Sequence, residues 1–176
     1  MRVIQVPVGE MQANAFIVFK DNSKKAFVVD PGADIEKIWS RLEYEGISEV
    51  THILLTHGHF DHIGAAAELK RRTGAKVCVH ERDLPMLTSN KDSLAVFAGV
   101  SIEPVEADIV LHGGETIRAA DIPVQVLHTP GHSGGSVCYI TGDVLFSGDT
   151  LFYMSCGRTD FPGSDPDEYH NSLHNV

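Results

Sequence analysis

Apolar residues come in short runs over the first thirty positions, with polar residues between them, as is typical of β-strands. The runs predict strands at residues 2–6, 15–20 and 25–30. The polar segment 21–24 predicts a turn between the last two strands. After Pro31 and Gly32, apolar side chains recur every three or four residues, which predicts an amphipathic helix that Gly46 ends. The chain is therefore expected to open with antiparallel strands and a helix.

The next segment predicts a βαβ unit. Residues 53–55 and 76–80 are apolar runs of strand length. The pattern between them predicts a helix over about residues 62–73, with Asp61 as its N-cap and Gly74 at its C-terminal end. A strand, a helix and a second strand in this order are typical of parallel pairing.

The second half of the chain returns to strands after a segment with weak periodicity. Residues 81–107 predict helical fragments and loop on the surface. Further strands are predicted at 109–111, 116–118, 123–127, 136–140 and 144–147. A last helix is expected to begin after Asp165 and Pro166. Together these elements predict an α/β sandwich, two packed sheets with helices outside, in a single domain over residues 1–176.

The composition narrows the classes of partner. Acidic residues outnumber basic ones by 24 to 14, and the formal net charge is −10. The sequence has no run of basic residues that could contact the phosphate backbone of a nucleic acid. No segment is apolar for long enough to cross a membrane or to act as a signal peptide, so we expect a cytoplasmic protein. Cys78 and Cys138 lie in apolar runs and are expected to be reduced and buried.

Histidines gather in one short segment that has the chemistry of a metal site. His57, His59, Asp61 and His62 lie between a predicted strand and the helix that follows it. Imidazole and carboxylate groups are the ligands that zinc and similar divalent metals prefer. Gly58 allows a bend that turns His57 and His59 toward a common point, while Asp61 and His62 are expected to face a neighbouring point.

Two later loops are expected to join this segment. His132 lies in the glycine-rich turn 129–136, and Asp149 follows the strand predicted at 144–147. Both residues come directly after predicted strands, where loops from neighbouring strands meet at one edge of a sheet. The sequence therefore predicts one centre built from three loops.

With these motifs, the chain resembles the metallo-β-lactamase-fold superfamily, and within it the glyoxalase II-like hydrolases, from Asn14 to Asp167. The resemblance implies an αββα sandwich and two metal ions, most simply Zn²⁺. It also implies that Asp30 supports the metal loop by hydrogen bonding, the alternative being an ordinary turn aspartate before Pro31. The metal ligands that the resemblance implies are His57, His59 and His132 for one ion, Asp61 and His62 for the second, and Asp149 between them.

The resemblance is incomplete toward the C-terminus. Members of the family usually continue with a further strand, a histidine that completes the second metal site, and a helix, none of which this sequence contains. The second site is therefore expected to be the weaker one. We also expect an unpaired sheet edge that favours self-association of the chain.

The resemblance implies hydrolysis of a small-molecule thioester, similar to the hydroxyacylglutathione hydrolases. A hydroxide shared by two metal ions would attack the carbonyl, with Asp61 and Asp149 as the catalytic carboxylates. Arg158 is expected to contact an anionic part of the substrate, and a salt bridge with Asp160 is the alternative. Thr159 and Asp160 stand where glyoxalase II has an aromatic pair, so recognition of glutathione itself stays open.

Two other functions remain open. Persulfide dioxygenases of the same superfamily use a single iron held by residues that correspond to His57, His132 and Asp149, all of which are present. A metal-binding protein with impaired catalysis is the second alternative, because the final histidine ligand is missing. A secreted β-lactamase and a nuclease are less compatible with this sequence, which has neither a signal peptide nor a basic surface segment.

Overall fold

The computed structural model describes residues 1–174, and its first sheet has six strands in the order β1-β2-β3-β4-β5-β6. The pairs β1/β2 and β2/β3 are antiparallel, and β3, β4, β5 and β6 are parallel to one another. After Lys25, β3 is apolar because both faces of the sheet are covered there. The strands are β1 Arg2–Val8, β2 Ala13–Phe19, β3 Lys25–Val29, β4 Glu49–Leu54, β5 Lys76–His80 and β6 Ile109–Leu111.

The second sheet is antiparallel, in the order β10-β9-β8-β7. β8 alternates buried and exposed residues along most of its length, as expected of a strand with one face on a core. A separate hairpin, β11/β12, follows this sheet. The strands are β7 Thr116–Ala119, β8 Ile122–His128, β9 Val137–Thr141, β10 Val144–Phe146, β11 Leu151–Phe152 and β12 Ser155–Cys156.

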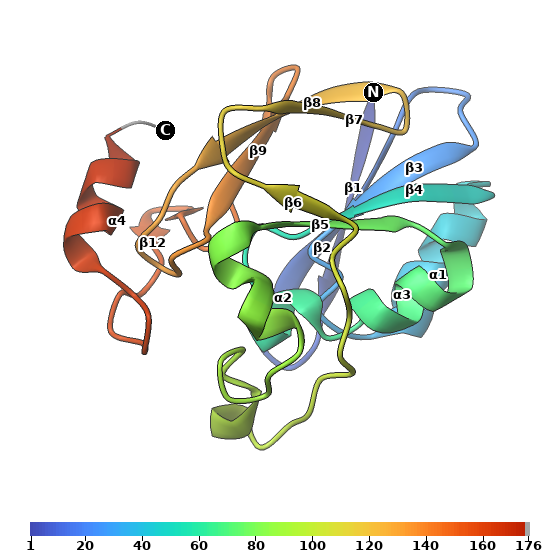
Figure 1. Ribbon diagram of the computed structural model, residues 1–176. Helices are drawn as coiled ribbons and strands as arrows, with labels where there is room; N and C mark the ends of the chain where they lie inside the picture. Colours follow the sequence, from blue (N-terminus) through green and yellow to red (C-terminus); the bar gives the residue numbers. More distant parts are fainter. Residues whose placement is uncertain (175–176) are drawn as a thin grey trace.

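Two hydrophobic cores hold the layers together. One lies between the first sheet and the helices α1 (Ile35–Tyr44) and α3 (Ala66–Thr73), which lie together on one side of that sheet in Figure 1. The other lies between the two sheets and contains Phe27 and Tyr139. Helix α4 (Pro166–Leu173) lies away from α1 and α3, beside the hairpin β11/β12 (Figure 1). The predicted sandwich of helices and two sheets is confirmed for the described residues, and residues 175 and 176 of the predicted domain lie outside them.

The helix predicted over residues 62–73 is interrupted at Gly64 and Ala65, and its predicted N-cap is wrong. The chain forms a single turn, α2 (Phe60–Ile63), before α3, and Asp61 lies inside α2 rather than capping a long helix. The break arises because Ala65 N donates to Pro31 O, which ties the junction to the loop after β3. Gly74 ends α3 with a left-handed φ of 71°, as predicted.

The sequence predicted that residues 81–107 lie on the surface, but part of this segment is buried. The segment contains the 3₁₀ helices η1 (Glu81–Leu87) and η2 (Ala95–Ala98). Leu87 and Ala95 are buried in the core beneath the first sheet. The weak periodicity has a simple cause, because a 3₁₀ helix repeats every three residues and these are short.

The strand ends that carry the predicted site meet at one edge of the sandwich. The loops after β3, β4 and β5 leave the first sheet at its parallel carboxyl edge, and those after β8 and β10 reach the same region. The two cysteines Cys78 and Cys138 are buried and free, as predicted. Within residues 1–174 no helix is both long and apolar enough to span a bilayer.

Candidate metal centre

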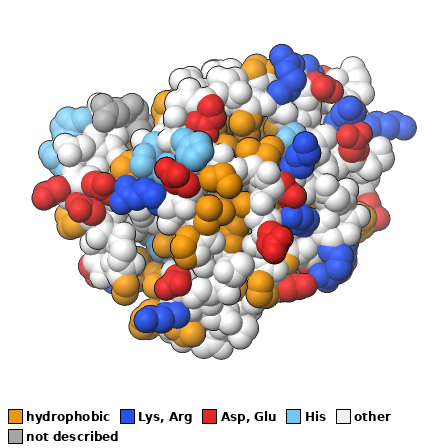
Figure 2. All heavy atoms as spheres, in the orientation of Figure 1, with side chains coloured by type: hydrophobic (Ala, Val, Ile, Leu, Met, Phe, Trp, Pro, Cys, Tyr) orange, Lys and Arg blue, Asp and Glu red, His pale blue; other side chains and the backbone are white. Residues whose placement is uncertain are grey.

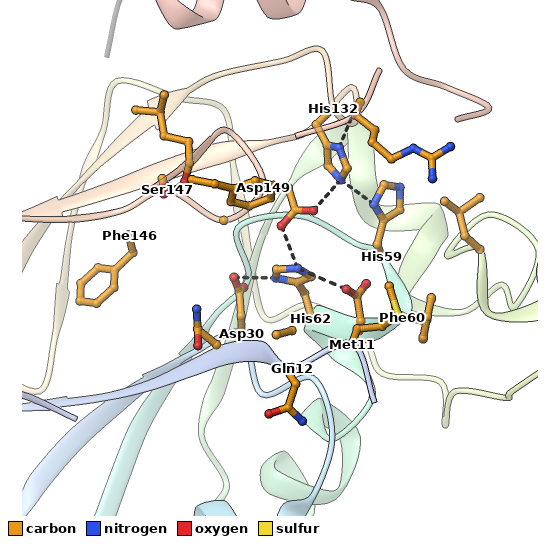
Figure 3. A pocket seen from close by; sticks show the side chains of 18 of the residues that line it. Met11, Gln12, Asp30, His59, Phe60, His62, His132, Phe146, Ser147 and Asp149 are labelled. Carbon is orange, nitrogen blue, oxygen red and sulfur yellow. Dashed lines mark hydrogen bonds and ion pairs between the residues drawn. The ribbon is translucent and has the colours of Figure 1, made fainter. Parts of the chain in front are cut away.

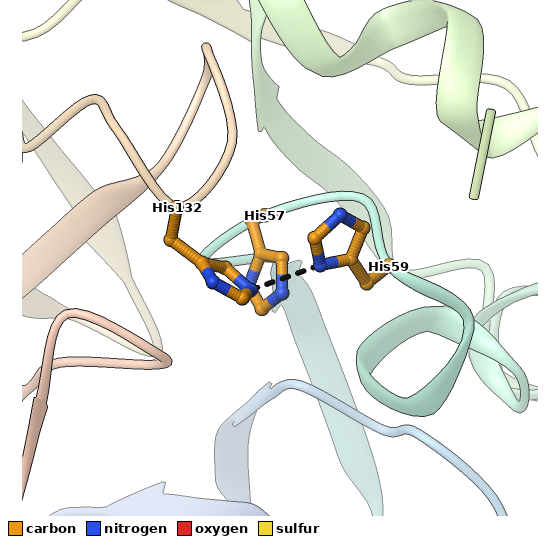
Figure 4. A group of neighbouring side chains, drawn as sticks. All are labelled: His57, His59 and His132. Atoms are coloured by element: carbon orange, nitrogen blue, oxygen red, sulfur yellow. Dashed lines mark hydrogen bonds between the residues drawn. The ribbon is translucent and has the colours of Figure 1, made fainter. Parts of the chain in front are cut away.

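His57, His59 and His132 turn their imidazole rings toward one another (Figure 4). Each offers a ring nitrogen within 4.8 Å of those of the other two, an arrangement that fits one metal ion. His59 Nδ1 lies 3.0 Å from His132 Nε2, and His132 Nδ1 donates to Arg158 O at 2.8 Å. Nε2 of His57 is buried and has no hydrogen-bond partner among the described residues. A buried nitrogen without a partner beside two converging imidazoles is suited to a metal ligand.

Two imidazoles of this first group, those of His57 and His59, are kept uncharged by their surroundings. Burial, followed by the nearby imidazoles, holds the pKa of His57 well below its usual value. Burial likewise lowers the pKa of His59 to about 3, with His132 as the next cause. Neutral imidazole is the form that binds a metal, so these two donors need not release a proton near neutral pH.

A second group shares His57 with the first and adds His62 and Asp149. The carboxylate of Asp149 lies between the two groups (Figure 3). Its Oδ1 is 3.2 Å from His62 Nε2, and its Oδ2 is 3.4 Å from His132 Nε2. This geometry suits a bridging carboxylate. The carboxylate of Asp61 is near the same place, with Oδ2 at 3.7 Å from His62 Nε2.

Asp30 holds the second group from behind. Its Oδ2 is 2.9 Å from His62 Nδ1, and its two oxygens accept hydrogen bonds from the backbone N–H and the hydroxyl of Thr56. The side chain thus makes the supporting bonds that the resemblance implied. Burial works against protonation of His62, but the charge of Asp30 and the hydrogen bonds to Asp149 and Asp30 raise its pKa well above the usual value. A metal entering here must therefore displace a proton, unlike at His57 and His59.

Arg158 is exposed and lines a pocket that His59, His62, His132 and Asp149 also line. Its Nε and Nη2 each donate to Asp160 at 2.8 Å, and its guanidinium lies 4.5 Å from the centre of the Phe161 ring. Both partners of this ion pair are about two-thirds exposed, at 65% and 66%. Such an exposed pair contributes little to stability, so the guanidinium can exchange Asp160 for another anion at small cost.

Two residues near the centre were not selected from the sequence. Asp83, in η1, is fully buried and bonds to both histidine loops. Tyr169, in α4, accepts from Gly157 N at 2.6 Å and donates to Thr150 O at 2.7 Å, so it joins the loops that follow β10 and β12. An aspartate and a tyrosine at isolated positions carry no spacing signal, and only their contacts identify them.

The family model of the metallo-beta-lactamase superfamily matches residues 8–176, nearly the whole chain. The chain belongs to this superfamily. As a member of this superfamily, the chain is a metal-binding protein. The two groups of histidines and carboxylate described above are its candidate ligands.

Three curated members of the superfamily are similar to this chain over most of its length. The probable metallo-hydrolase YqgX of Bacillus subtilis is 33% identical over 177 residues, which cover 99% of this chain and 82% of the relative. Hydroxyacylglutathione hydrolase GloC of Haemophilus influenzae is 32% identical, with coverage of 98% and 82%. The probable polyketide biosynthesis zinc-dependent hydrolase BaeB of Bacillus velezensis is 32% identical, with coverage of 95% and 68%.

Solved structures agree with these relatives. The BLEG-1 B3 metallo-beta-lactamase gives a TM-score of 0.92 at 36% identity. The superposition covers 99% of this chain and 84% of the lactamase chain. TTHA1623 in a di-iron-bound form gives 0.86 at 37%, with coverage of 98% and 85%. ETHE1 from Myxococcus xanthus gives 0.81 at 26%, with coverage of 100% and 69%. The predicted fold is confirmed, and the chain is a metallo-hydrolase of this superfamily.

Proposed function

We propose that this metallo-hydrolase cleaves a small-molecule thioester at a centre of two metal ions, most simply Zn²⁺. The observation that carries the proposal is the position of Asp149, whose two carboxylate oxygens face His62 and His132, one histidine of each group. A carboxylate between two sets of imidazoles is suited to holding two ions side by side. The similarity to a hydroxyacylglutathione hydrolase supports the thioester as substrate.

The donor set fits the metals that are proposed. His57, His59 and His132 would hold one ion, and His62 with Asp61 the other, while Asp149 would contact both. The chemistry that such ions supply is hydroxide near neutral pH and polarisation of a carbonyl oxygen. Asp61 and Asp149 would orient the attacking water by accepting hydrogen bonds from it. A thiolate then leaves readily, because it is a stable anion that needs no general acid.

The cavity above these residues has room for the substrate. It measures about 860 Å³, and the imidazoles of His59, His62 and His132 form part of its wall. Phe97, Phe152 and other apolar side chains line its open side. Mostly apolar walls with a few convergent polar groups are usual for small-molecule sites. Arg158 is proposed to receive an anionic group of the substrate there.

The distribution of charged side chains on the surface bears on the class of partner. Figure 2 shows basic and acidic side chains interspersed over one face of the molecule, without a broad area of Lys and Arg alone. Together with the net charge of −10, this pattern supports a small-molecule substrate rather than nucleic acid. A cytoplasmic location stays a proposal.

Hydrolysis of a thioester with and without metal tests the proposed function. We expect the purified protein to release free thiol from a lactoyl thioester, to lose this activity in a chelator and to regain it with Zn²⁺. His132→Ala should remove metal from the first group and abolish turnover. Thioester hydrolysis that is unaffected by chelation, or a His132→Ala protein with wild-type metal content, would contradict the proposal.

A mononuclear iron dioxygenase is the second candidate, and one observation favours it. His57, His132 and Asp149 lie together in the centre, and they are the three residues that such a site needs. Oxygen consumption with a persulfide by the Fe²⁺-loaded protein separates this activity from hydrolysis. We expect no such consumption if the thioesterase proposal is correct.

A further inference from the structure

We propose that Asp83 is a positioning residue for the metal centre, which holds the His57–His59 loop and the His132 loop at a set separation. The inference rests on the proposed metal site but not on the identity of the substrate. The two loops are 73 residues apart in sequence at His59 and His132, yet their imidazole nitrogens lie 3.0 Å apart. One backbone bond, from Val137 N to Thr56 O at 2.8 Å, joins the two loops at their bases, so a further contact is needed to fix the separation at the histidines themselves.

The Asp83 carboxylate makes this contact. Its Oδ2 accepts from Gly58 N at 2.9 Å, and Gly58 lies between His57 and His59. The same Oδ2 accepts from the hydroxyl of Ser133 at 2.7 Å, and Oδ1 accepts from Gly135 N at 2.7 Å. One side chain thus receives donors from both loops, one residue away from a candidate ligand in each. Asp83 is fully buried, so water does not compete for these bonds.

Asp83 is itself held at a fixed place. Its helix η1 starts directly after β5, where the His80 side chain accepts from Arg82 N at 3.3 Å. The ring of His80 stacks on that of His128 at 4.0 Å, with an angle of 13° between the rings. His128 Nε2 in turn lies 3.0 Å from Gly134 O, in the His132 loop. The ends of β5 and β8 therefore set the position of the carboxylate.

The packing leaves both loops little freedom around this carboxylate. A Cβ atom on Gly58 would lie 2.5 Å from Cβ of Met86, and one on Gly135 would lie 2.6 Å from Asp83 Oδ1. Residues that pack this closely move only together. The separation of the two loops thus depends on η1, which carries none of the candidate metal ligands.

Asp83→Asn is a sharp test, because asparagine keeps the shape of the side chain but replaces one oxygen by an NH₂ group. If that group takes the place of Oδ2, it faces the N–H of Gly58. If it takes the place of Oδ1, it faces the N–H of Gly135. In either orientation two donors meet, so one of the loops loses its bond. A change in the partners behind metal ligands typically lowers metal affinity about 10- to 100-fold.

The measurements are zinc affinity, by competition with a chromophoric chelator, and the visible spectrum of the Co²⁺-loaded protein. In Asp83→Asn we expect the tighter zinc affinity to fall about 10- to 100-fold and the cobalt bands to change in position or intensity. Asp108→Asn is the matched control: Asp108 also accepts a backbone N–H, from Val77, and pairs with Lys70, but it is remote from the centre. This control should lose stability without either metal effect.

Ser133→Ala provides a second variant should Asp83→Asn fold poorly. It removes the hydroxyl that donates a hydrogen bond to Asp83 Oδ2 and leaves both backbone donors in place. We expect a smaller loss of zinc affinity and a cobalt spectrum intermediate between those of the wild type and Asp83→Asn. Folded variants with wild-type zinc affinity and an unchanged cobalt spectrum would overturn the proposed role of Asp83. A wild-type protein that binds no zinc or cobalt would instead refute the metal site, and with it the proposed function.

Discussion

Asp30 and His62 are hydrogen bonded across 32 positions of the sequence, with Asp30 Oδ2 at 2.9 Å from His62 Nδ1. The bond directs the other ring nitrogen, Nε2, to Asp149 Oδ1 at 3.2 Å. A carboxylate behind an imidazole selects its tautomer and its orientation. Because Asp30 also accepts two bonds from Thr56, the metal loop and the His62 ring share one anchor.

Asp30→Asn should therefore weaken the second metal group in particular. If the NH₂ group takes the place of Oδ2, it faces the N–H of His62, which loses its fixed orientation; if it takes the place of Oδ1, it faces the backbone N–H of Thr56. We expect the affinity for the second ion to fall about 10- to 100-fold, with a smaller effect on the first. Metal content after dialysis against graded chelator measures both. Asp92→Asn, at an exposed position, is the control, and equal loss of both ions would contradict this prediction.

The metal-free protein should lose stability on acidification, with His59 as one cause. Burial lowers its pKa to about 3 in the folded state, against about 6.5 in the unfolded chain. Between these values only the unfolded chain binds the proton, so the stability is present above about pH 6.5 and is lost as the pH falls toward 3. The slope is about 1.4 kcal/mol per pH unit for a single group.

Urea unfolding of wild type and His59→Asn in chelator, at several pH values from 7 to 4, measures this contribution. The asparagine has no proton to bind, so the free energy of unfolding of the wild type should fall relative to the variant as the pH is lowered. A difference between the two proteins that stays constant over this range would mean that His59 is protonated in the folded state.

Arg158→Lys should mainly raise KM for an anionic thioester. Arg158 is exposed at the pocket wall, and its bidentate fork is lost in lysine. We expect KM to rise about tenfold, with kcat nearly unchanged. Steady-state kinetics test this, and a lower melting temperature with unchanged KM would instead assign Arg158 to the ion pair with Asp160.

Tyr169→Phe should destabilise the loop that carries Asp149. The hydroxyl that is lost accepts from Gly157 N and donates to Thr150 O, and its burial raises the pKa of Tyr169 to about 12, so it stays protonated at neutral pH. Leaving these backbone groups without a partner should lower the free energy of unfolding by about 1–3 kcal/mol. Tyr153→Phe, at a residue 96% exposed, is the control and should change nothing.

The first metal group should fill before the second. It has three imidazoles, of which His57 and His59 have lowered pKa values, whereas His62 must release a proton to bind. We also propose that the chain self-associates along β10, an edge strand of the second sheet with Leu145 exposed. Metal stoichiometry and sedimentation should be measured over a range of protein concentrations. Two tightly bound ions in a dilute monomer would contradict both expectations.

The sequence alone determined the chemistry of the site and most of the strands. His57, His59, Asp61 and His62 stand within six residues, so their ligand character is visible without any tertiary contact. Strand positions followed from apolar runs, because burial of one or both faces of a strand requires apolar residues at alternate or successive positions. Gly74 ended its helix as expected for the same local reason.

The tertiary structure alone decided what the loops do to one another. The break between α2 and α3 depends on a bond from Ala65 to Pro31, which no local pattern contains. The role of Asp83 also depends on tertiary contacts, since its hydrogen bonds to Gly58 and Gly135 reach segments that are 25 and 52 residues away. A buried carboxylate is identified by the donors that surround it, and those donors are backbone groups, which every sequence has in equal number. Metal ligands can therefore be recognised by residue type, whereas Asp83, which holds their loops in place, can be recognised only by contact.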